Sequence, residues 1–590
     1  MTADITANPP VTAAKQGGDL PHVWAPEAWI SKFGAGATPP TTVRDAPPDD
    51  GKPVGKLAGL LFAAKDNIDA EGLATTAACP AFAYMPAANA AVVQKLIDAG
   101  ASLLGKTNLD QFACGLNGTR SPYGAVPNAI NPAYVSGGSS SGSAYVVATG
   151  QVDFALGTDT AGSGRVPAGL NNIVGIKPSR GLISARGVLP AAQSVDCVSI
   201  FARTVGMAVQ VLEAAMGYDP LDPFSRKLAL QAEPYPAAFR FGVPSTLEFY
   251  GDHAAAAAFN QASQKLQAMG GTSVTIDFTP LAEAAALLYE SALVAERYTA
   301  IRGFFDAHRQ DVIEPVRSII ASGRDYSAAD LYEAQTKLKM LGQQAEAMWD
   351  GIDVLLVPTA PTHYRLGEMQ KDPVALNRNL GAYTNFVNLL DYAAISVPSC
   401  MRPDGLPFGI TLIGRCGSDL QLADLGQRYH HGTGLTMGAT GQPLPAMQGI
   451  PGLTAKPMVK VAVVGAHLSG MPLNGQLSSR GATLAATTRT APHYRLYALP
   501  GTTPPKPGMC RVAANQGEAI ALEIWDMPLE HYGSFVALIP HPLGIGTLEL
   551  EDGSKVQGFV CESDALQGAQ DISSFGGWRA YLASLAPAAA

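Results

Sequence analysis

The stretch that decides the fold is Ser136–Gly169, with the sequence SGGSSSGSAYVVATGQVDFALGTDTAGSGRVPAG. Its two clusters of glycine and serine enclose two apolar runs, Ala144–Ala148 and Val152–Leu156. A flexible glycine–serine linker would not carry such buried-type runs, so we reject that interpretation. Glycines on both sides of a packed element indicate tight turns, whose backbone N–H groups can converge on an anion. We therefore expect a binding or catalytic loop in this stretch.

Outward from this stretch, short apolar runs alternate with helical patterns. Leu57–Ala64 predicts a buried strand, Asn89–Ala99 an amphipathic helix, and Ala101–Leu104 a second strand. Helical patterns dominate residues 254–348, and Val354–Val357 predicts a return to strand. The strand–helix–strand order favours an α/β fold with a largely parallel sheet.

Four regions follow from composition along the chain. Residues 1–20 are polar and rich in proline and glycine, which predicts a loose N-terminus. We expect a catalytic domain over 21–437, a Gly/Pro-rich linker over 438–457 and a smaller, β-rich α+β domain over 458–590. The last region has strand patterns of its own and is long enough to fold as a domain.

Charge and cysteine content exclude several functional classes. The net charge of −9, without long basic runs, disfavours binding to nucleic acid or to an anionic membrane surface. No uncharged apolar run approaches the roughly 18–20 residues that a membrane helix needs. The N-terminus lacks the pattern of a secretory signal, and seven scattered cysteines favour reduced thiols. These features predict a cytoplasmic protein.

Three further motifs are weak. Gly100–Thr107, GASLLGKT, matches a P-loop expression, but its interior is typical of a strand rather than of a phosphate-binding loop. Gly138–Gly142, GSSSG, matches a nucleophile elbow, yet no downstream histidine is singled out as its partner. His430 and His431 are adjacent and cannot share one helix face as metal ligands. We expect no metal site.

Several short motifs together resemble the amidase signature family. They are GGSSSG at 137–142, GTDTAGS at 157–163 and Arg165-x-Pro167, with the flanking segments KDN at 65–67, GKTN at 105–108 and GIKPS at 175–179. The resemblance covers Pro53 to about Val205 and continues more weakly to about residue 435. It implies an α/β amidase-signature fold, in which helices cover a central mixed, largely parallel sheet.

The resemblance also implies roles for individual residues. Ser163 is the expected nucleophile, Ser139 a bridging serine on a cis peptide bond, and Lys65 the terminal base. The N–H groups of Thr160, Ala161, Gly162 and Ser163 are the expected oxyanion hole, with Asp159 and Arg165 as organisers of the loop. Gly164 stands where relatives carry an aliphatic residue, and we expect it to loosen the turn.

Elementary chemistry agrees with this triad. A serine hydroxyl is a weak nucleophile until a base takes its proton. Lysine is such a base only when it is neutral, and its ordinary pKa of ~10.4 leaves little neutral amine near pH 7. Burial of Lys65 beside serines would lower that pKa.

A second set of segments resembles the allophanate hydrolases of this family. In Leu287–Tyr298, LLYESALVAERY, the resemblance implies that Tyr289 and Arg297 hold a substrate carboxylate, with Gly115 as a further substrate-binding residue. Helical spacing would let Tyr289 and Arg297 reach one pocket rim. The alternative is an exposed arginine paired with Glu290 or Glu296. Further similar segments are Thr119–Gly124, Asp196–Ser199, Gly465–His467 and Gly577–Arg579.

The resemblance implies hydrolysis of allophanate (urea-1-carboxylate) to ammonia and carbon dioxide, without a cofactor, during degradation of urea or s-triazines. It also implies a homodimer. Relatives that fuse this activity to a urea carboxylase carry a biotin-carboxylase half and a biotinyl Met-Lys-Met, and the sequence given has neither. We therefore expect any urea carboxylase to be a separate protein. His493 is our candidate for a second step in the C-terminal domain, in which the first product breaks down to carbon dioxide and a second ammonia.

Three alternatives stay open at this point. The chain could be a general amidase for neutral amides, or an A-type component of a tRNA-dependent amidotransferase. The C-terminal domain could also be an assembly module without chemistry.

Overall fold

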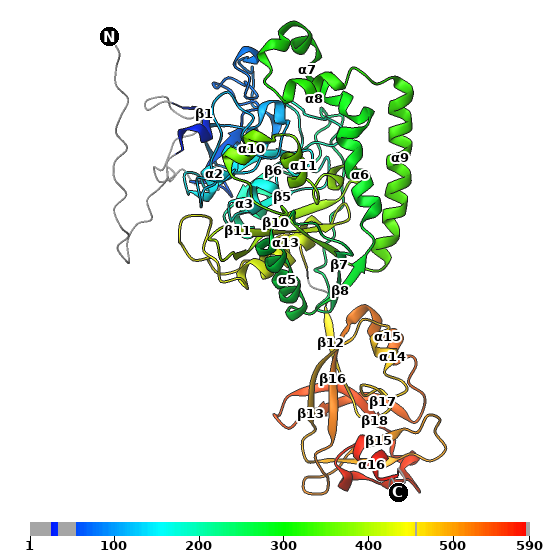
Figure 1. Cartoon of the computed structure of the whole chain (residues 1–590). Coiled ribbons are helices and arrows are strands. Elements are labelled where there is room, and N and C mark those ends of the chain that lie inside the picture. The colour runs from blue at the N-terminus through cyan, green and yellow to red at the C-terminus, as the bar shows by residue number, and fades with distance from the viewer. Residues whose placement is uncertain (1–24, 34–54, 455–456, 586–590) are drawn as a thin grey trace, which may run out of the picture. The chain divides into compact units, whose positions relative to one another are not determined.

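The computed structural model describes residues 25–33, 55–454 and 457–585. The chain divides into two compact units, Met1–Leu453 and Thr454–Ala590 (Figure 1). The expected loose N-terminus, 1–20, lies outside the described residues. Among the helices of the described ranges, none has the length and apolarity that crossing a membrane requires.

An eleven-stranded sheet forms the centre of the first unit, in the order β1-β3-β2-β4-β6-β5-β10-β11-β9-β7-β8. Its strands are β1 (Trp29–Lys32), β2 (Leu61–Lys65), β3 (Ser102–Thr107), β4 (Phe154–Asp159), β5 (Val174–Lys177), β6 (Cys197–Ala202), β7 (Phe239–Pro244), β8 (Gly271–Ile276), β9 (Val354–Pro358), β10 (Ala393–Met401) and β11 (Pro407–Gly414).

The sheet is mixed, as expected, but the parallel pairs are confined to two blocks. Strand β2 runs parallel to β3 and β4, and β7 runs parallel to β8 and β9. The other neighbouring strands are antiparallel, so the parallel share is smaller than the sequence led us to expect. Because β2, β3 and β4 are parallel, their carboxyl ends, at Lys65, Thr107 and Asp159, meet at one edge of the sheet.

Helices cover this sheet (Figure 1). They are α1 (Ala91–Asp98), α2 (Ser141–Ala148), α3 (Val166–Leu170), α4 (Val205–Ala215), α5 (His253–Ala268), α6 (Thr279–Glu290), α7 (Ala295–His308), α8 (Val316–Ser322), α9 (Ala328–Glu346), α10 (Leu366–Lys371), α11 (Ala375–Leu380), α12 (Phe386–Leu389) and α13 (Asp419–His431). Every residue of α2 is buried. Its small residues, SGSA at 141–144, let it approach β4 closely, so the glycine–serine cluster belongs to the core.

The expected elements are present with shifted bounds. Strand β2 ends on Lys65, one residue beyond the predicted run, and α1 and β3 occupy the predicted helix and second strand. In the region expected to be helical, the structure adds strand β8. Four of its six residues are not buried, since β8 lies at the edge of the sheet, so its pattern is less apolar than that of a central strand.

Most of the expected linker packs on the first unit instead of joining two units. The Asn172 amide donates to the Gly438 carbonyl over 2.8 Å, and the Gln427 amide donates to the Gln448 carbonyl over 2.6 Å. Ile450 is buried in the main core. The boundary between the units therefore falls after Leu453, later than the predicted start of the linker.

The second unit has its own sheets and its own core. A five-stranded sheet has the order β13-β16-β12-β18-β17, and a three-stranded sheet has the order β15-β14-β19. The elements are β12 (Met458–Val463), α14 (Gly475–Ser478), β13 (Thr483–Arg489), β14 (Tyr494–Ala498), β15 (Pro507–Arg511), β16 (Ala521–Pro528), α15 (Leu529–Val536), β17 (Leu543–Glu549), β18 (Lys555–Cys561), β19 (Gln570–Asp571) and α16 (Trp578–Leu585). The predominance of strands confirms the expected β-rich unit.

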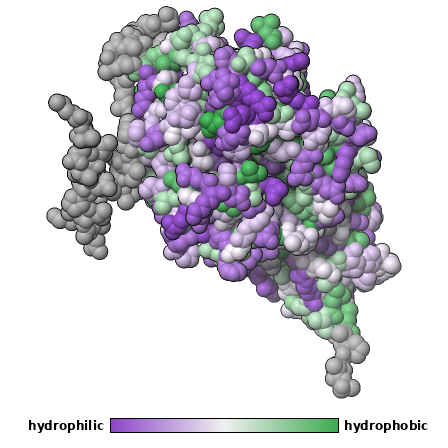
Figure 2. Space-filling view, turned by 45° about the horizontal axis from the view of Figure 1, so that its top comes forward, coloured by the Kyte–Doolittle hydropathy of each residue, from purple (hydrophilic) through white to green (hydrophobic). Residues whose placement is uncertain are grey.

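The face shown in Figure 2 is mainly hydrophilic, with hydrophobic residues scattered among polar ones. Scattered apolar residues of this kind are ordinary on a protein surface and do not by themselves mark a binding face.

Candidate active site

Lys65 lies at the carboxyl end of β2 and is fully buried. Its Nζ donates to the Ser139 Oγ over 2.8 Å and to the Thr158 Oγ1 over 2.7 Å. Thr158 is on the neighbouring parallel strand β4, so the sheet itself brings the two side chains together. Burial lowers the pKa of Lys65 to about 7, although nearby carboxylates act to raise it. A large fraction of this amine is therefore neutral near pH 7 and can accept a proton.

The peptide bond between Gly138 and Ser139 is cis, as the resemblance implies. It lies just before α2, and the Ser139 carbonyl accepts a hydrogen bond from the Asp110 N–H over 3.0 Å. A Cβ atom at position 138 would collide with the Asp110 carboxylate, so only glycine fits there. This packing directs the Ser139 hydroxyl toward Lys65.

Ser163 lies in the turn between β4 and α3 and is almost fully buried. Its Oγ is 3.5 Å from the Gly115 carbonyl oxygen, which brings the two predicted residues together. Within the described part of the chain, no hydrogen bond joins Ser139 to Ser163. Catalytic hydrogen bonds are often long or poorly aligned before substrate binds, so this geometry is compatible with a relay from Ser163 through Ser139.

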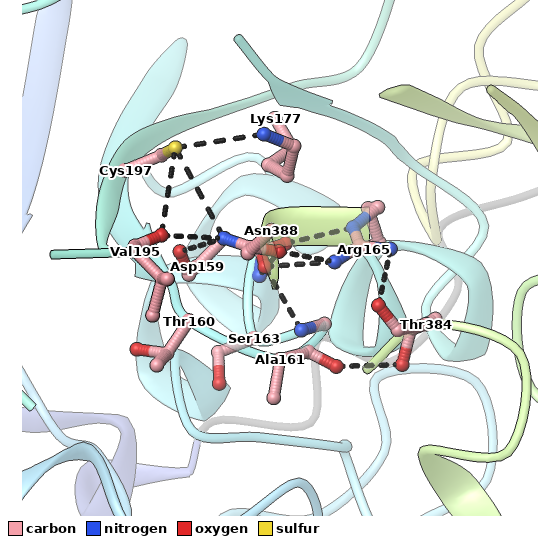
Figure 3. A network of polar contacts seen from close by, with 12 residues as sticks. Asp159, Thr160, Ala161, Ser163, Arg165, Lys177, Val195, Cys197, Thr384 and Asn388 are labelled. Atoms are coloured by element: carbon pink, nitrogen blue, oxygen red, sulfur yellow. Dashed lines mark hydrogen bonds and ion pairs between the residues drawn. The ribbon is translucent and has the colours of Figure 1, made fainter. Parts of the chain in front are cut away.

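Asp159, at the end of β4, accepts four hydrogen bonds from the loop that follows it. The N–H groups of Gly162 and Gly164 donate to its carboxylate over 2.8 and 2.9 Å, and Arg165 pairs with it through two nitrogens at 2.9 Å (Figure 3). Although burial acts to raise the pKa of Asp159, the adjacent Arg165 holds it below its usual value. The loop is thus organised around a buried carboxylate.

Arg165 is also held from the far side of the loop. Its guanidinium donates to the Thr384 carbonyl over 3.2 Å and to the Asn388 amide oxygen over 3.0 Å (Figure 3). The Thr384 hydroxyl in turn donates to the Ala161 carbonyl over 2.7 Å. Sequence reasoning did not identify Thr384 or Asn388, which lie more than 200 residues from the loop along the chain and carry no recognisable motif.

Gly164 does not loosen the turn, contrary to our expectation. Its N–H is bound by Asp159, and a Cβ atom at this position would collide with the side chain of Ser199 on β6. The glycine makes room for that serine, so the departure from the family pattern is compensated by close packing.

The donors of the expected oxyanion hole are not equivalent. The N–H groups of Ala161 and Ser163 have no hydrogen-bond acceptor within the part of the chain that the structure describes. The N–H of Gly162, in contrast, donates to Asp159. The Thr160 hydroxyl is bound by Asp196 over 2.5 Å. In this arrangement the Gly162 N–H stabilises the loop through Asp159, and we no longer count it as a donor to substrate.

Tyr289 and Arg297 meet, but not on one continuous helix. Tyr289 is on α6 and Arg297 is on α7, with a single-turn 3-10 helix, Ala292–Val294, between them. The Arg297 guanidinium donates to the Tyr289 hydroxyl over 3.0 Å and lies 5.0 Å from the centre of its ring. The break in the helix, rather than helical periodicity, therefore brings the two side chains together.

Arg297 is only 3% exposed, and its Nε and Nη1 atoms have no hydrogen-bond partner among the described residues. The alternative of an exposed arginine paired with Glu296 is wrong, because Glu296 accepts instead from the backbone and hydroxyl of Ser194, each over 2.7 Å. A buried guanidinium with two donor groups that lack partners is costly unless an acceptor pairs with it.

Known families match most of the chain. Residues 40–423 match the amidase family. The chain belongs to the amidase family. Residues 459–583 of this amidase match the family described as the allophanate hydrolase C-terminal domain.

Individual relatives of this amidase fall into two groups. The urea amidolyase of Saccharomyces cerevisiae is 43% identical over 544 residues, which cover 90% of this chain and 30% of the yeast protein. The chain thus spans less than a third of the length of that relative. The A-type component of the glutamyl-tRNA(Gln) amidotransferase of Haloarcula marismortui is 34% identical over 409 residues, covering 64% of this chain and 96% of that protein.

A solved structure of Kluyveromyces lactis allophanate hydrolase is similar to both units of this amidase. It is 42% identical, with a TM-score of 0.70, and the match covers 95% of this chain and 94% of that chain. The similarity therefore includes the C-terminal unit, which the match to the amidotransferase component does not reach in full.

In the C-terminal unit, His493 packs against its own neighbours. Its ring stacks on Tyr494 with centroids 5.0 Å apart, and its Nε2 lies 3.5 Å from Glu549. A cavity of about 160 Å³ lies elsewhere in this unit, and His467, Gln476 and Lys506 are among its lining residues. His493 is not among them.

His467 is held firmly at this cavity. Its Nε2 is 2.9 Å from the Gln476 Oε1, and its ring stacks on Phe559 with centroids 5.0 Å apart. Burial lowers the pKa of His467, so its neutral form is favoured. The segment Gly465–His467, which follows the buried end of strand β12, stands out in the sequence only by its resemblance to the allophanate hydrolases, and that resemblance assigned no role to His467.

One cluster in the described ranges has potential metal ligands close together. His541, Glu562 and Asp564 place one ligand atom each within 4.8 Å of one another, all on exposed side chains of the C-terminal unit. Exposed side chains of this kind are not enclosed as the ligands of a structural metal site are.

Proposed function

We propose that this amidase hydrolyses allophanate, as the K. lactis protein named for that reaction does. The observation that carries the proposal is the buried guanidinium of Arg297, whose Nε and Nη1 lack partners among the described residues and whose Nη2 binds Tyr289. A planar carboxylate would accept hydrogen bonds from both groups. A neutral amide would leave the buried charge uncompensated, at a cost in binding free energy.

The proposed reaction uses the buried residues at the edge of the sheet. Neutral Lys65 takes the proton of Ser139, Ser139 takes the proton of Ser163, and Ser163 attacks the terminal ureido carbonyl of the substrate. The developing negative charge on oxygen is stabilised by the N–H groups of Thr160, Ala161 and Ser163. Ammonia leaves, and water then releases N-carboxycarbamate from the acyl-enzyme. The proton transfers and the attack use side chains of this chain alone.

The second step is proposed for the C-terminal unit. N-carboxycarbamate yields carbon dioxide and a second ammonia, and the cavity at His467 supports this assignment better than His493 does. The cavity has a polar wall formed by His467, Gln476 and Lys506, and a lysine can attract a small anion. We therefore move the candidate residue from His493 to His467 and keep His493 as a comparison.

Exchange of either histidine for alanine separates the two candidates. With His467→Ala we expect the ammonia released per allophanate consumed to fall toward one equivalent in the first seconds, while the release of carbon dioxide lags behind. With His493→Ala we expect both products at the wild-type ratio. Equal behaviour of both variants and the wild type would restore the view of the C-terminal unit as an assembly module.

The substrate itself is tested by ammonia release from allophanate, malonamate, biuret and a neutral aryl amide. We expect turnover of allophanate above the others, lost in Ser163→Ala. In Arg297→Met we expect KM for allophanate to rise by about 10²-fold or more, with the neutral amide unaffected. A wild type that prefers the aryl amide would instead favour a general amidase.

Three further expectations concern partners. A homodimer predicts about twice the mass of the chain in light scattering. Activity of the purified chain without other proteins would exclude the amidotransferase alternative. We also propose a functional link to urea carboxylase activity, which makes allophanate from urea, on a route that degrades urea or s-triazines. Similarity to urea amidolyases supports this link.

A further inference from the structure

Asp196 is a second buried carboxylate, besides Asp159, that binds the nucleophile loop. It lies just before β6, and its Oδ1 accepts the Thr160 hydroxyl over 2.5 Å. Its Oδ2 accepts the N–H groups of Ala191 and Ala192 over 2.7 and 3.1 Å. Thr160 directly precedes Ala161, so the Asp196 carboxylate fixes the start of the loop that carries the expected oxyanion donors.

Asp196 is also within electrostatic reach of the two cations of the site. Burial raises the pKa of Asp196 to about 6, while Arg297 acts to lower it. For Lys65, burial is the main influence on the pKa, and Asp110, Asp196 and Asp159 act against it by favouring the protonated form. Arg297 favours the neutral form of Lys65.

The three carboxylates around Lys65 are not alike. Asp159 is paired with Arg165, and Asp110 accepts backbone N–H groups of its own loop, those of Asn117, Gly118 and Arg120. Asp196 contacts the nucleophile loop as Asp159 does, but through the Thr160 hydroxyl, and Arg297 acts to lower its pKa. Unlike Asp159, it forms no ion pair with a residue in the described ranges.

We propose that Asp196 is a positioning residue for amide hydrolysis, which orients Thr160 in the nucleophile loop and whose negative charge acts on the protonation of Lys65. This inference rests on the proposed function, because it takes Ser163 as the nucleophile and Lys65 as its base. It adds a role for a residue outside the triad and the oxyanion hole.

Two changes separate the hydrogen bond from the charge. Thr160→Val removes the hydroxyl and keeps the shape, so we expect kcat for allophanate to fall about 10-fold, with KM little changed and the acidic limb of the pH profile in place. Thr160→Ser restores the hydroxyl and should restore kcat. Asp196→Asn removes the charge, which favours neutral Lys65, so we expect the acidic limb to move to lower pH.

A matched control is Glu296→Gln. Glu296 accepts hydrogen bonds from Ser194, which lies two residues before Asp196. This variant therefore loosens the segment that carries Asp196 without touching Thr160. We expect its kcat and its acidic limb to match those of the wild type. If Glu296→Gln reproduces the effects of Asp196→Asn, the role of Asp196 is structural only and the inference fails.

A fluorophosphonate probe makes the test independent of the substrate. It labels an activated serine directly, so the pH dependence of labelling reports the protonation of Lys65 without any substrate carboxylate. If the wild type ignores allophanate but labelling of Asp196→Asn shifts as described, the proposed substrate fails and the role of Asp196 stands. If allophanate is hydrolysed and Asp196→Asn shifts the acidic limb neither of the kcat profile nor of the labelling profile, the charge effect fails.

The Thr160 variants keep the test decisive if Asp196→Asn does not fold. Equal kcat for Thr160→Val, Thr160→Ser and the wild type would overturn the positioning role. A loss in Thr160→Val that Thr160→Ser restores would support it, with thermal unfolding as the check that all three proteins are folded.

Discussion

At the level of single residues, Lys65 shows how position alone changes chemistry. It is the last residue of a central strand, and its amine is enclosed by Ser139 and Thr158. Because none of the carboxylates in the described ranges contacts the amine directly, burial dominates and its pKa falls to about 7. A lysine that is half neutral near pH 7 can serve as a base, which an exposed lysine cannot do efficiently.

The first prediction concerns the pH dependence of activity. Activity requires neutral Lys65, so we expect kcat/KM to rise with pH through an inflection near pH 7 and then to level off. Lys65→Met should lower kcat by ~10²–10⁴-fold and remove the inflection. Initial rates of ammonia release across the neutral pH range measure both. An inflection that persists in Lys65→Met would assign it to another group.

The second prediction concerns stability. The pKa of Lys65 is about 7 in the folded protein and ~10.4 in the unfolded chain, so the unfolded chain binds more protons between these values. The free energy of unfolding therefore rises with pH from about 7 to 10, because the cost of removing this proton on folding becomes smaller as the pH approaches ~10.4. Lys65→Met should unfold at a higher temperature than the wild type slightly below neutral pH, and the difference should shrink as the pH approaches the pKa of an ordinary lysine. A difference that grows with pH would contradict this explanation.

At the level of secondary-structure elements, the turn between β4 and α3 depends on an ion pair. The Asp159 carboxylate satisfies two backbone N–H groups and the Arg165 guanidinium, and both side chains are fully buried. Asn388, on α12, and Thr384, two residues before that helix, complete the network. The loop is therefore held by contacts from distant parts of the chain, so its geometry does not depend on local propensity.

The third prediction follows from that burial. Asp159→Asn leaves Arg165 as an uncompensated buried cation, so we expect a loss of about 3–5 kcal/mol of stability together with loss of activity. Denaturant unfolding measures the first effect. Asp391→Asn is a suitable control, because Asp391 pairs with the partly exposed Arg180 and Arg226, and we expect it to cost about 1 kcal/mol or less. Equal losses in the two variants would contradict the importance of burial.

For the molecule as a whole, the two units have separate hydrophobic cores. The core of the second unit consists of residues from within that unit, among them Val461, Leu496, Trp525 and Trp578. The residues named for the first reaction, from Lys65 to Arg297, all lie in the first unit. We therefore expect each unit to fold on its own.

The fourth prediction tests this independence. A protein ending at residue 453 should unfold cooperatively and retain Ser163-dependent release of the first ammonia, while separately expressed 454–590 should fold alone. Circular dichroism during heating and the ammonia assay measure these properties. Loss of all activity in the shorter protein, with its fold intact, would show that the first reaction needs the second unit.

Local sequence patterns were sufficient to predict the α/β class and the β-rich C-terminal unit, and they marked the glycine–serine loop as a candidate site, whereas the roles of its residues came from the family resemblance and stay predictions. The patterns concerned are the apolar period of β2 and α1, the glycines around Ser139 and Ser163, and the strand patterns after residue 458. Such patterns predict a helix, strand or turn because the residues that form one of these elements follow one another along the chain.

The remaining features became visible only in the folded molecule. There the Gly162 N–H binds Asp159, Ser199 fills the space at Gly164, Tyr289 meets Arg297 across a break between helices, and a cavity lies at His467 rather than at His493. Each of these depends on contacts between segments or on a departure from regular structure. Burial and hydrogen bonding across such contacts are set by packing, and for that reason no local pattern contains them.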